Sequence, residues 1–281
     1  MAAGTTLSPA QTQGRARLGI SDQHAETFGH PLFKQLNLKH ARLIVPWDAL
    51  HVSFDRVAVD AWLNSARASG IRPLVSFSHS RVHPRRLPSV SQFRRAFRAF
   101  RKEYPWVREY SPWNEANHQS QPTYHRPRWA ARYYNIVRSA CPKCTVVALD
   151  VLDQPDMVRY VRAFQRWAKV RPRLWGLHNY RQVNRRLSTG TRKLLRNVRG
   201  NIWLTETGGI VNFGSTLHYN THRAARVTRY LFELVKNRRI KRIYIYSWWG
   251  EKRGARFDAG LVGPNGKPRP AYYIVKDYLH R

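Results

Sequence analysis

The chain has 281 residues, of which 42% are hydrophobic, so it can bury a full core in one large domain. It carries 50 basic and 16 acidic residues, and a formal net charge of +34 excludes a charge-balanced surface. No run of about 18 apolar residues occurs, which excludes a membrane-spanning helix and predicts no membrane insertion.

The first residues of the chain differ from the rest in composition. Residues 1–14 (MAAGTTLSPAQTQG) are small and polar, without the basic start and apolar stretch of a secretory signal. We expect residues 1–16 to form a disordered lead-in. One domain is expected over residues 17–281, because no linker or low-complexity insert interrupts that stretch.

Eight short apolar runs follow, with ends about 25 to 42 residues apart, close to the length of one strand–helix unit. Valine, isoleucine, leucine and aromatic residues fill these runs without strict polar alternation, as in strands that are covered on both faces. The predicted strands are Arg17–Asp22, Ala41–Trp47, Arg72–Ser78, Val107–Glu115, Thr145–Asp150, Leu174–Tyr180, Asn201–Glu206 and Arg242–Trp249.

The segments between these runs show helical periodicity, with apolar residues three and four positions apart. Ser53, Ser91 and Asp156 are predicted N-caps, and Gly70 is predicted to follow the helix before the third strand. A closing helix is expected over Pro270–His280. The clearest apolar stripes are Phe93/Phe97/Phe100, Trp129/Tyr133/Ile136/Val137, Val158/Val161/Phe164/Ala168 and Val227/Leu231/Leu234.

Eight strands alternating with helices favour an α/β fold in which a parallel sheet closes into a single (β/α)8, or TIM, barrel. A doubly wound dinucleotide-binding fold is disfavoured, because the first strand is not followed by a GxGxxG turn. Chemistry in a barrel sits at the carboxyl ends of the strands. The residues at these ends are Asp22, Trp47, Asp48, His79, Asn114, Glu115, Asp150, His178, Tyr180, Glu206, Trp248 and Trp249.

Two glutamates end predicted strands: Glu115 in SPWNEAN (111–117) and Glu206 in NIWLTETGG (201–209). The period of two in a strand places Ile202 and Leu204 on the side of Glu206, so we expect both to point into the barrel below that carboxylate. Retaining glycosidases use two carboxyls about 5 to 5.5 Å apart, one as nucleophile and one as acid and then base. The acid must hold its proton near neutral pH, which apolar or like-charged surroundings favour. A structural ion pair with an arginine is the alternative for each glutamate.

Arg42 and several tryptophans are further candidates for this site. An arginine inside the apolar run ARLIVPW must find a carboxylate, and its expected partner is a strand-end acid. With Glu206 as that partner Arg42 would keep the carboxylate ionised, and a purely structural pairing is the alternative. Strand-end indoles can stack on the apolar faces of sugar rings, and strand parity alone leaves open whether Trp248 or Trp249 faces the cleft.

The cysteines and histidines give weaker signals. Cys141 and Cys144 form a lone CxxC motif without further zinc ligands nearby, which favours a local bridge or two structural thiols. The histidines lie on separate loops without metal-ligand spacing, so we predict no metal and no cofactor. The histidines considered are His24, His79, His83, His118 and His125.

From Gly19 to about Tyr278 the sequence resembles the retaining (β/α)8 glycoside hydrolases of clan A, most nearly families 39 and 5. Asn114 and Glu115 match the Asn-Glu pair that ends strand four in that clan, and Glu206 matches the glutamate that ends strand seven. The resemblance implies that Glu115 is the acid/base, that Glu206 is the nucleophile and that Asn114 contacts the sugar 2-hydroxyl. Many relatives have Asn-Glu-Pro where this chain has Asn-Glu-Ala, which loosens the family assignment.

The resemblance also implies roles for four other residues. Arg42 matches an arginine of strand two that supports the nucleophile. His178 and Tyr180, in His-Asn-Tyr, match polar positions of strand six beside the carboxylates. Trp248 matches an aromatic floor supplied by strand eight. All four are therefore expected to contact the substrate or the carboxylates.

Together these features predict a retaining hydrolase of O-glycosidic bonds in a poly- or oligosaccharide, acting as a monomer outside the cell. A cytoplasmic location is left open, since no signal is visible. One alternative is a non-catalytic glycan-binding barrel. The other is a polyanion-binding protein whose basic surface attracts acidic glycans, an anionic cell envelope or, non-specifically, nucleic acid. A solvated arginine-rich surface without such a role is the simplest interpretation of the charge.

Overall fold

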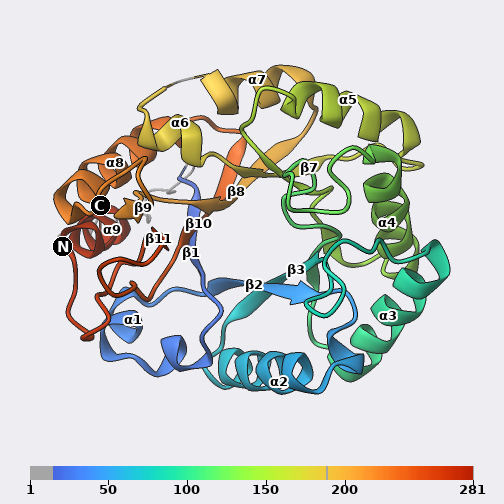
Figure 1. Cartoon of the computed structure of the whole chain (residues 1–281), viewed down its shortest axis with the longest axis horizontal. Helices are drawn as coiled ribbons and strands as arrows, with labels where there is room; N and C mark the ends of the chain where they lie inside the picture. Colours follow the sequence, from blue (N-terminus) through green and yellow to red (C-terminus); the bar gives the residue numbers. More distant parts are fainter. Residues whose placement is uncertain (1–14, 188, 281) are drawn as a thin grey trace, which may run out of the picture.

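Parallel strands form a ring that is surrounded by helices (Figure 1) in the computed structural model, which describes residues 15–187 and 189–280. Residues 1–14 of the predicted lead-in lie outside the described residues. Ala16, at the end of the lead-in, is buried. The strands pair in parallel in the order β5-β4-β3-β2-β1-β10-β8-β7-β6. Their bounds are β1 Arg17–Ser21, β2 His40–Pro46, β3 Arg72–Ser78, β4 Glu109–Ser111, β5 Thr145–Val146, β6 Asp150–Leu152, β7 Leu174–His178, β8 Asn201–Thr207 and β10 Ile240–Tyr246.

The ring closes through the segment that contains β5 and β6. On one side the Val147 amide donates to the carbonyl of Tyr110 in β4, and the Asp150 amide donates to the carbonyl of Trp113, two residues beyond the end of β4. On the other side Ala148 donates to Leu174 at the start of β7. Residues 145–152 therefore act as one barrel strand, so the eight predicted strands form one (β/α)8 barrel, as the sequence predicted.

The helices cover the outside of this ring. At the start of α3 (Val90–Glu103) the side chain of Ser89, not the predicted Ser91, accepts a hydrogen bond from the Gln92 amide in a capping box. Val52, not the predicted Ser53, is the N-cap residue of α2, and Ser53 is the first residue of that helix. Asp156 is at the N-cap position of α5, as predicted, but its side chain makes no capping hydrogen bond. The helices are α1 Pro31–Leu36, α2 Ser53–Ala68, α3 Val90–Glu103, α4 Pro127–Ala140, α5 Met157–Trp167, α6 Tyr180–Asn184, α7 Thr189–Asn197, α8 Thr221–Leu234 and α9 Pro270–His280, with short 3-10 turns at Ala25–Gly29 and Ala49–His51.

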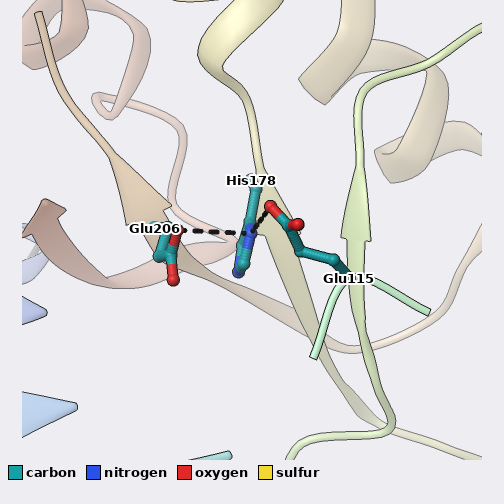
Figure 2. Close-up of side chains that lie close together, drawn as sticks. All are labelled: Glu115, His178 and Glu206. Atoms are coloured by element: carbon teal, nitrogen blue, oxygen red, sulfur yellow. Dashed lines mark hydrogen bonds and ion pairs between the residues drawn. The ribbon is translucent and has the colours of Figure 1, made fainter. Parts of the chain in front are cut away.

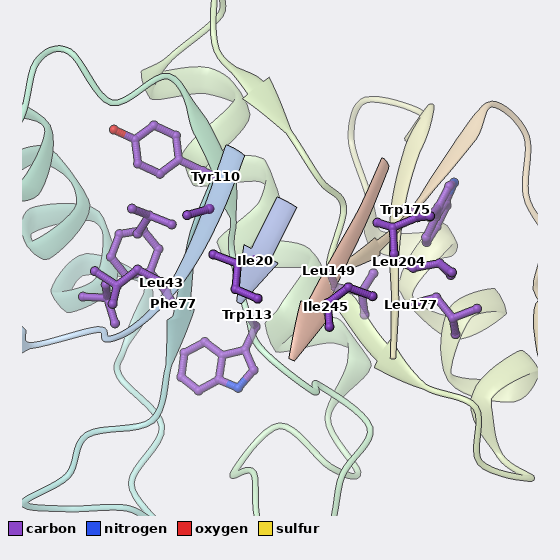
Figure 3. Packing of buried hydrophobic residues seen from close by; sticks show 14 of the residues in the cluster. Ile20, Leu43, Phe77, Tyr110, Trp113, Leu149, Trp175, Leu177, Leu204 and Ile245 are labelled. Atoms are coloured by element: carbon purple, nitrogen blue, oxygen red, sulfur yellow. The ribbon is translucent and has the colours of Figure 1, made fainter. Parts of the chain in front are cut away.

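The hydrophobic core lies mainly between the strands and the helices (Figure 3). Phe77 of β3, for example, makes edge-to-face contacts with Phe93, Phe97 and Phe100, which are the predicted apolar stripe of α3. A small separate apolar cluster fills the inside of the barrel, and its members are Leu74, Val147, Trp203 and Tyr244. Arg42, Ser76 and Asp150 are buried polar residues that bond to one another: Arg42 and Ser76 both donate to the Asp150 carboxylate.

Two further features lie outside the ring. Cys141 and Cys144 form a disulfide directly after α4, as the interpretation of a local bridge anticipated. Two short strands, β9 Asn212–Phe213 and β11 Phe257–Asp258, pair in antiparallel fashion next to the carboxyl end of the barrel. Within the described part of the chain, no helix has the length and apolarity that crossing a membrane requires.

Candidate active site

The two predicted glutamates meet at the carboxyl end of the barrel. An oxygen of Glu115, an oxygen of Glu206 and a ring nitrogen of His178 lie within 4.8 Å of one another. Figure 2 shows His178 between the two carboxylates, with Nδ1 3.1 Å from Oε1 of Glu115 and 3.7 Å from Oε2 of Glu206. The Glu206 side chain is 7% exposed and the Glu115 side chain 21% exposed, so both are largely shielded from water but accessible from one side.

Glu206 reaches the inside of the barrel through an irregularity in β8. Ile202 and Leu204 belong to the outer apolar core, whereas Trp203 lies in the interior cluster. The prediction that Ile202 and Leu204 point inward below Glu206 is therefore wrong. Gly176 of β7 pairs with Trp203 of β8, and His178 pairs with Glu206. Between these two pairs β7 advances by two residues and β8 by three. This bulge changes the alternation of faces and turns Glu206 inward.

Glu115 does not lie on a strand but in the turn that follows β4, which ends earlier than predicted, at Ser111. Its backbone adopts a positive φ of 45°, a left-handed conformation that is unfavourable for a residue with a side chain. The amide of the next residue, Ala116, donates to the carbonyl of Asp150, and the amide of His118 donates to the Glu115 carbonyl. These bonds hold the turn so that the carboxylate faces His178.

Arg42 joins the acidic groups of the site. Its guanidinium donates to Oε1 of Glu206 at 2.5 Å, to Oδ2 of Asp150 at 2.8 Å and to Oδ1 of Asn114 at 2.6 Å. Arg42 and Asp150 are fully buried. Burial opposes ionisation of Asp150, but the charges of Arg42 and His178 outweigh it and hold the pKa of Asp150 below its usual value. One buried arginine thus orients Glu206 and Asn114 and compensates two carboxylates.

His178 and Glu115 influence each other's protonation. Burial favours a neutral imidazole, yet the Glu206 charge and the Glu115 hydrogen bond raise the pKa of His178. Burial likewise favours a protonated Glu115, but its hydrogen bond to His178 and the charge of that ring lower the pKa of Glu115. The surroundings of Glu115 are therefore cationic rather than the apolar or like-charged ones that the sequence analysis associated with a general acid.

Two tyrosines approach Glu206 from the side. The Tyr180 hydroxyl donates to Oε2 of Glu206 at 3.3 Å. Burial and the nearby Glu206 charge raise the pKa of Tyr180 well above its ordinary value, so it remains a donor. Tyr246, at the end of β10, lines the same pocket, and burial and the Glu206 charge raise its pKa as well. Asn114 also faces this pocket.

Trp248 does not reach the site, which corrects the expectation that it forms the floor. Strand β10 ends at Tyr246, three residues before the predicted end, and Trp248 is fully buried. Its indole packs between Phe33 of α1 and Tyr272 of α9, on the outer side of the barrel. Tyr246 takes the place beside the carboxylates that the sequence analysis gave to Trp248.

The carboxylates open into a pocket of about 570 Å³. One wall is apolar and comes from the strand ends and the β9–β11 pair, with Leu152, Ile210, Phe213 and Phe257. The other wall is polar and comes mainly from the segment around α6. A pocket with an apolar wall and few convergent polar groups suits a ring that has both apolar faces and hydroxyls.

Glu115, His178 and Glu206 are also the one group in the described residues that could ligate a metal ion. One imidazole nitrogen and two carboxylate oxygens are ligands that suit a zinc ion. The guanidinium of Arg42 against Glu206 disfavours an added cation, and the acid/base chemistry of the pair requires none. The absence of a metal therefore stays a prediction.

Sequence reasoning missed the central place of Asp150. It stands at the end of a predicted strand, but only the structure shows Ser76 and Thr205 donating to its carboxylate at 2.6 and 2.8 Å, together with Arg42. Gly176 makes room for it, because a Cβ there would lie 2.0 Å from Oδ1 of Asp150. A buried acid needs buried partners, and the hydroxyl of Ser76 inside an apolar run was the available signal, whereas the regular alternation predicted for β8, with Glu206 inward, would have placed Thr205 outward.

No family model and no curated protein matches this sequence. Solved structures do match. They include a family 10 endoxylanase retrieved from a sugarcane soil metagenome (TM-score 0.68, 13% identity, 96% of this chain and 97% of that one). A family 39 glycoside hydrolase from Bacteroides cellulosilyticus WH2 matches with a TM-score of 0.60 and 14% identity, over 94% of this chain and 63% of that one. An intracellular xylanase from Thermoanaerobacterium saccharolyticum, in complex with xylotriose, matches with a TM-score of 0.65 and 14% identity, over 93% of this chain and 95% of that one.

The chain has the fold of these clan A glycoside hydrolases. The match extends over nearly the whole described barrel, as the resemblance implied. At this level of identity the likeness concerns the fold, so the activity has to be argued from the site itself.

Proposed function

We propose that this protein is a retaining glycoside hydrolase that cleaves O-glycosidic bonds in an oligo- or polysaccharide. The observation that carries the proposal is the approach of the Glu115 and Glu206 carboxylates to within 4.8 Å, facing one pocket. Retaining enzymes hold their carboxyls about 5 to 5.5 Å apart, whereas inverting enzymes leave about 6.5 to 9.5 Å for a water molecule. The fold shared with xylanases supports the same assignment.

Glu206 is the group best prepared to act as nucleophile. Arg42 binds its Oε1 and Tyr180 donates to its Oε2, so the carboxylate is oriented and its negative charge is stabilised. In the first step a Glu206 oxygen bonds to the anomeric carbon while the bond from that carbon to the leaving oxygen breaks. Glu115 gives its proton to the leaving oxygen. In the second step Glu115 takes a proton from water, the water oxygen bonds to the anomeric carbon, and the Glu206 carboxylate is released.

The proton for the first step is held jointly by His178 and Glu115. One proton can bridge their 3.1 Å contact, and the raised pKa of His178 together with the lowered pKa of Glu115 favours the imidazole as its holder in the free site. A bound sugar excludes water from the 21% exposed Glu115, and this desolvation favours transfer of the proton to Glu115. Glu115 then donates it to the leaving oxygen.

The pocket supplies the contacts that hold a sugar ring. Asn114 is fixed through its Oδ1 by Arg42, which leaves its amide nitrogen to donate to a hydroxyl beside the anomeric carbon. Tyr246 and Phe257 offer aromatic surface for the apolar face of a ring. We assign Asn114, Tyr180 and Tyr246 to the substrate, and Arg42 and His178 to the positioning of the two carboxylates.

An activated 2-fluoro glycoside tests this proposal directly. After a panel of aryl glycosides has identified the preferred sugar, its 2-fluoro derivative should inactivate the enzyme and label one peptide, with the mass increase on Glu206. The variant Glu206→Gln should resist labelling. The control Glu251→Gln, which changes an exposed glutamate, should be labelled at the wild-type rate. A label on another residue would refute the assignment, and no turnover of any glycoside would favour a non-catalytic glycan-binding barrel.

We further propose that the protein acts outside the cytoplasm. The Cys141–Cys144 disulfide supports this location, because disulfides persist in oxidising compartments and are rare in the cytosol. Alkylation of intact cells followed by mass spectrometry measures the state of both cysteines. Two alkylated thiols in the native protein would contradict the proposed location.

A further inference from the structure

A second pocket lies at the opposite end of the barrel from the carboxylates. It is a cleft of about 680 Å³ between the last turns of α5 and α7 and the loops that lead into β7 and β8. The two helices run next to each other at the outside of the ring (Figure 1). Because β7 and β8 begin here, the cleft is at the amino ends of the strands, whereas Glu115 and Glu206 are at the carboxyl ends.

The lining of this cleft is unusually basic. We call it the basic cleft, and its six cationic side chains are Arg162, Arg166, Lys169, Arg171, Arg196 and Arg199. All six are exposed, and the lining contains no aspartate or glutamate. None of the ion pairs found among residues 15–187 and 189–280 involves any of the six. Their charges therefore repel one another without a compensating acid from the described part of the chain.

Ordinary structural roles explain only part of this charge. Arg166 and Arg196 lie in the last turns of α5 and α7, where a cation complements the helix dipole. Arg162 donates to Oδ1 of Asn197 and so joins the two helices. For Lys169 and Arg171, in the loop after α5, no such role is visible in the described structure, and the same holds for Arg199. These side chains add charge to a concave surface that is already positive.

We propose that the basic cleft binds an acidic polysaccharide, with guanidinium groups contacting the carboxylates of successive sugar residues. Five of its six cations are arginines, whose planar fork matches a carboxylate in bidentate fashion. The rest of the lining is polar or small and comes from Gln165, Ala168, Pro172, Asn197 and Val198. None of the described residues that line the cleft is aromatic, whereas single-stranded nucleic acid is usually bound on several successive aromatic platforms, so the lining favours an acidic polysaccharide over nucleic acid.

The choice of a polysaccharide rests on the proposed function, since a glycosidase encounters carbohydrate polymers. Binding at the amino ends of the strands would hold the enzyme on an acidic polymer while the pocket at the other end remains free. The site would thus raise the local concentration of substrate without taking part in bond cleavage. The large positive charge of the chain would then be partly functional.

Affinity measurements with matched charge variants test the proposal. The cleft variant changes Arg166, Arg171 and Arg199 to Gln; the control variant changes Arg94, Arg95 and Arg98 to Gln on the exposed face of α3, with the same loss of charge. Both are made with Glu206→Gln, so that hydrolysis does not consume the probe. A fluorescent oligogalacturonate is the probe, and a neutral xylo-oligosaccharide and a single-stranded DNA of equal charge are the comparisons.

The cleft variant should bind the oligogalacturonate about tenfold more weakly, and the control variant should lose less than about twofold. The slope of log K against log salt should fall by about two for the cleft variant, since three contacts are lost at about 0.7 each. Equal losses in both variants would show diffuse attraction and overturn the proposal. DNA that binds more tightly than the oligogalacturonate, and loses affinity in the cleft variant, would overturn the choice of polysaccharide.

Aryl glycosides measured on the same charge variants, with Glu206 intact, separate this proposal from the proposed function. The turnover of these small substrates should be unchanged, because the basic cleft is at the other end of the barrel. Loss of oligogalacturonate binding with normal turnover supports the second site. Normal turnover with no such loss refutes the second site and leaves the hydrolase intact.

Discussion

Replacing Arg42 by methionine removes the guanidinium that Asp150 and Glu206 share. Asp150 is fully buried and Glu206 is 6% exposed, so neither carboxylate gains much contact with water when the cation is lost. Breaking a buried ion pair by removing one partner costs about 3–5 kcal/mol. Asp150 keeps the hydroxyls of Ser76 and Thr205, so we expect a loss of about 4 kcal/mol in the free energy of unfolding at pH 7.

The loss should depend on pH. In the native protein the pKa of Asp150 is lowered, so this group stabilises the fold above the unfolded-state pKa and ceases to do so as the pH falls through the folded-state pKa. Without Arg42 burial dominates, and the pKa of Asp150 rises above its unfolded value. Protonation then relieves the buried charge, so the cost of Arg42→Met should shrink as the pH falls from 7 towards about 5.

Guanidinium denaturation at both pH values measures this effect. Arg94→Met, on the exposed face of α3, is the control and should change the free energy of unfolding by less than about 0.5 kcal/mol. A loss below about 1 kcal/mol for Arg42→Met would refute the reasoning. So would a loss of equal size at both pH values, since the cost would then not come from an uncompensated carboxylate.

Three further changes have defined outcomes. Glu115→Gln should slow the hydrolysis of glycosides with poor leaving groups by about 10²–10⁴-fold. Dinitrophenyl glycosides need no acid, so formation of the glycosyl-enzyme from them should slow far less. Equal slowing of glycosyl-enzyme formation for both kinds of substrate would contradict the role of Glu115 as acid. Replacing Cys141 and Cys144 by alanine should lower stability by about 2 kcal/mol in thermal unfolding, with unchanged activity, because the bridge closes only a short loop. Gly176→Ala should cost about 1–3 kcal/mol and lower activity, because its Cβ would lie 2.0 Å from Oδ1 of Asp150; wild-type activity would show that the carboxylate can move.

The sequence was sufficient for the barrel and for the meeting of the two glutamates. Regular spacing of apolar runs sets the number of strands, and a closed parallel barrel brings all strand ends to one face. Glu115 and Glu206 therefore met even though Glu115 lies in a turn beyond the end of β4 rather than on the strand. Topology tolerates an error of a few residues in a strand boundary when both residues lie near the same end.

The sequence was insufficient where the direction of a side chain depends on local backbone geometry. The bulge in β8 places Glu206 inside although Ile202 and Leu204 point outward, and regular alternation cannot reveal a bulge. Trp248 was misplaced because β10 ends at Tyr246, which apolar composition alone does not indicate. The place of Asp150 depends on contacts from several strands, so it required the folded barrel.

The stereochemistry of hydrolysis tests the central claim most directly. Proton NMR of the sugar released in the first minutes, with the best substrate of the aryl glycoside panel, identifies the anomer before mutarotation mixes the two forms. One oxygen of Glu115 and one of Glu206 lie within 4.8 Å of each other, which is nearer to the separation of about 5 to 5.5 Å in retaining enzymes than to the roughly 6.5 to 9.5 Å that admits a water molecule in inverting ones, so the configuration should be retained. Release of the opposite anomer would contradict the account, because it would require direct attack by water.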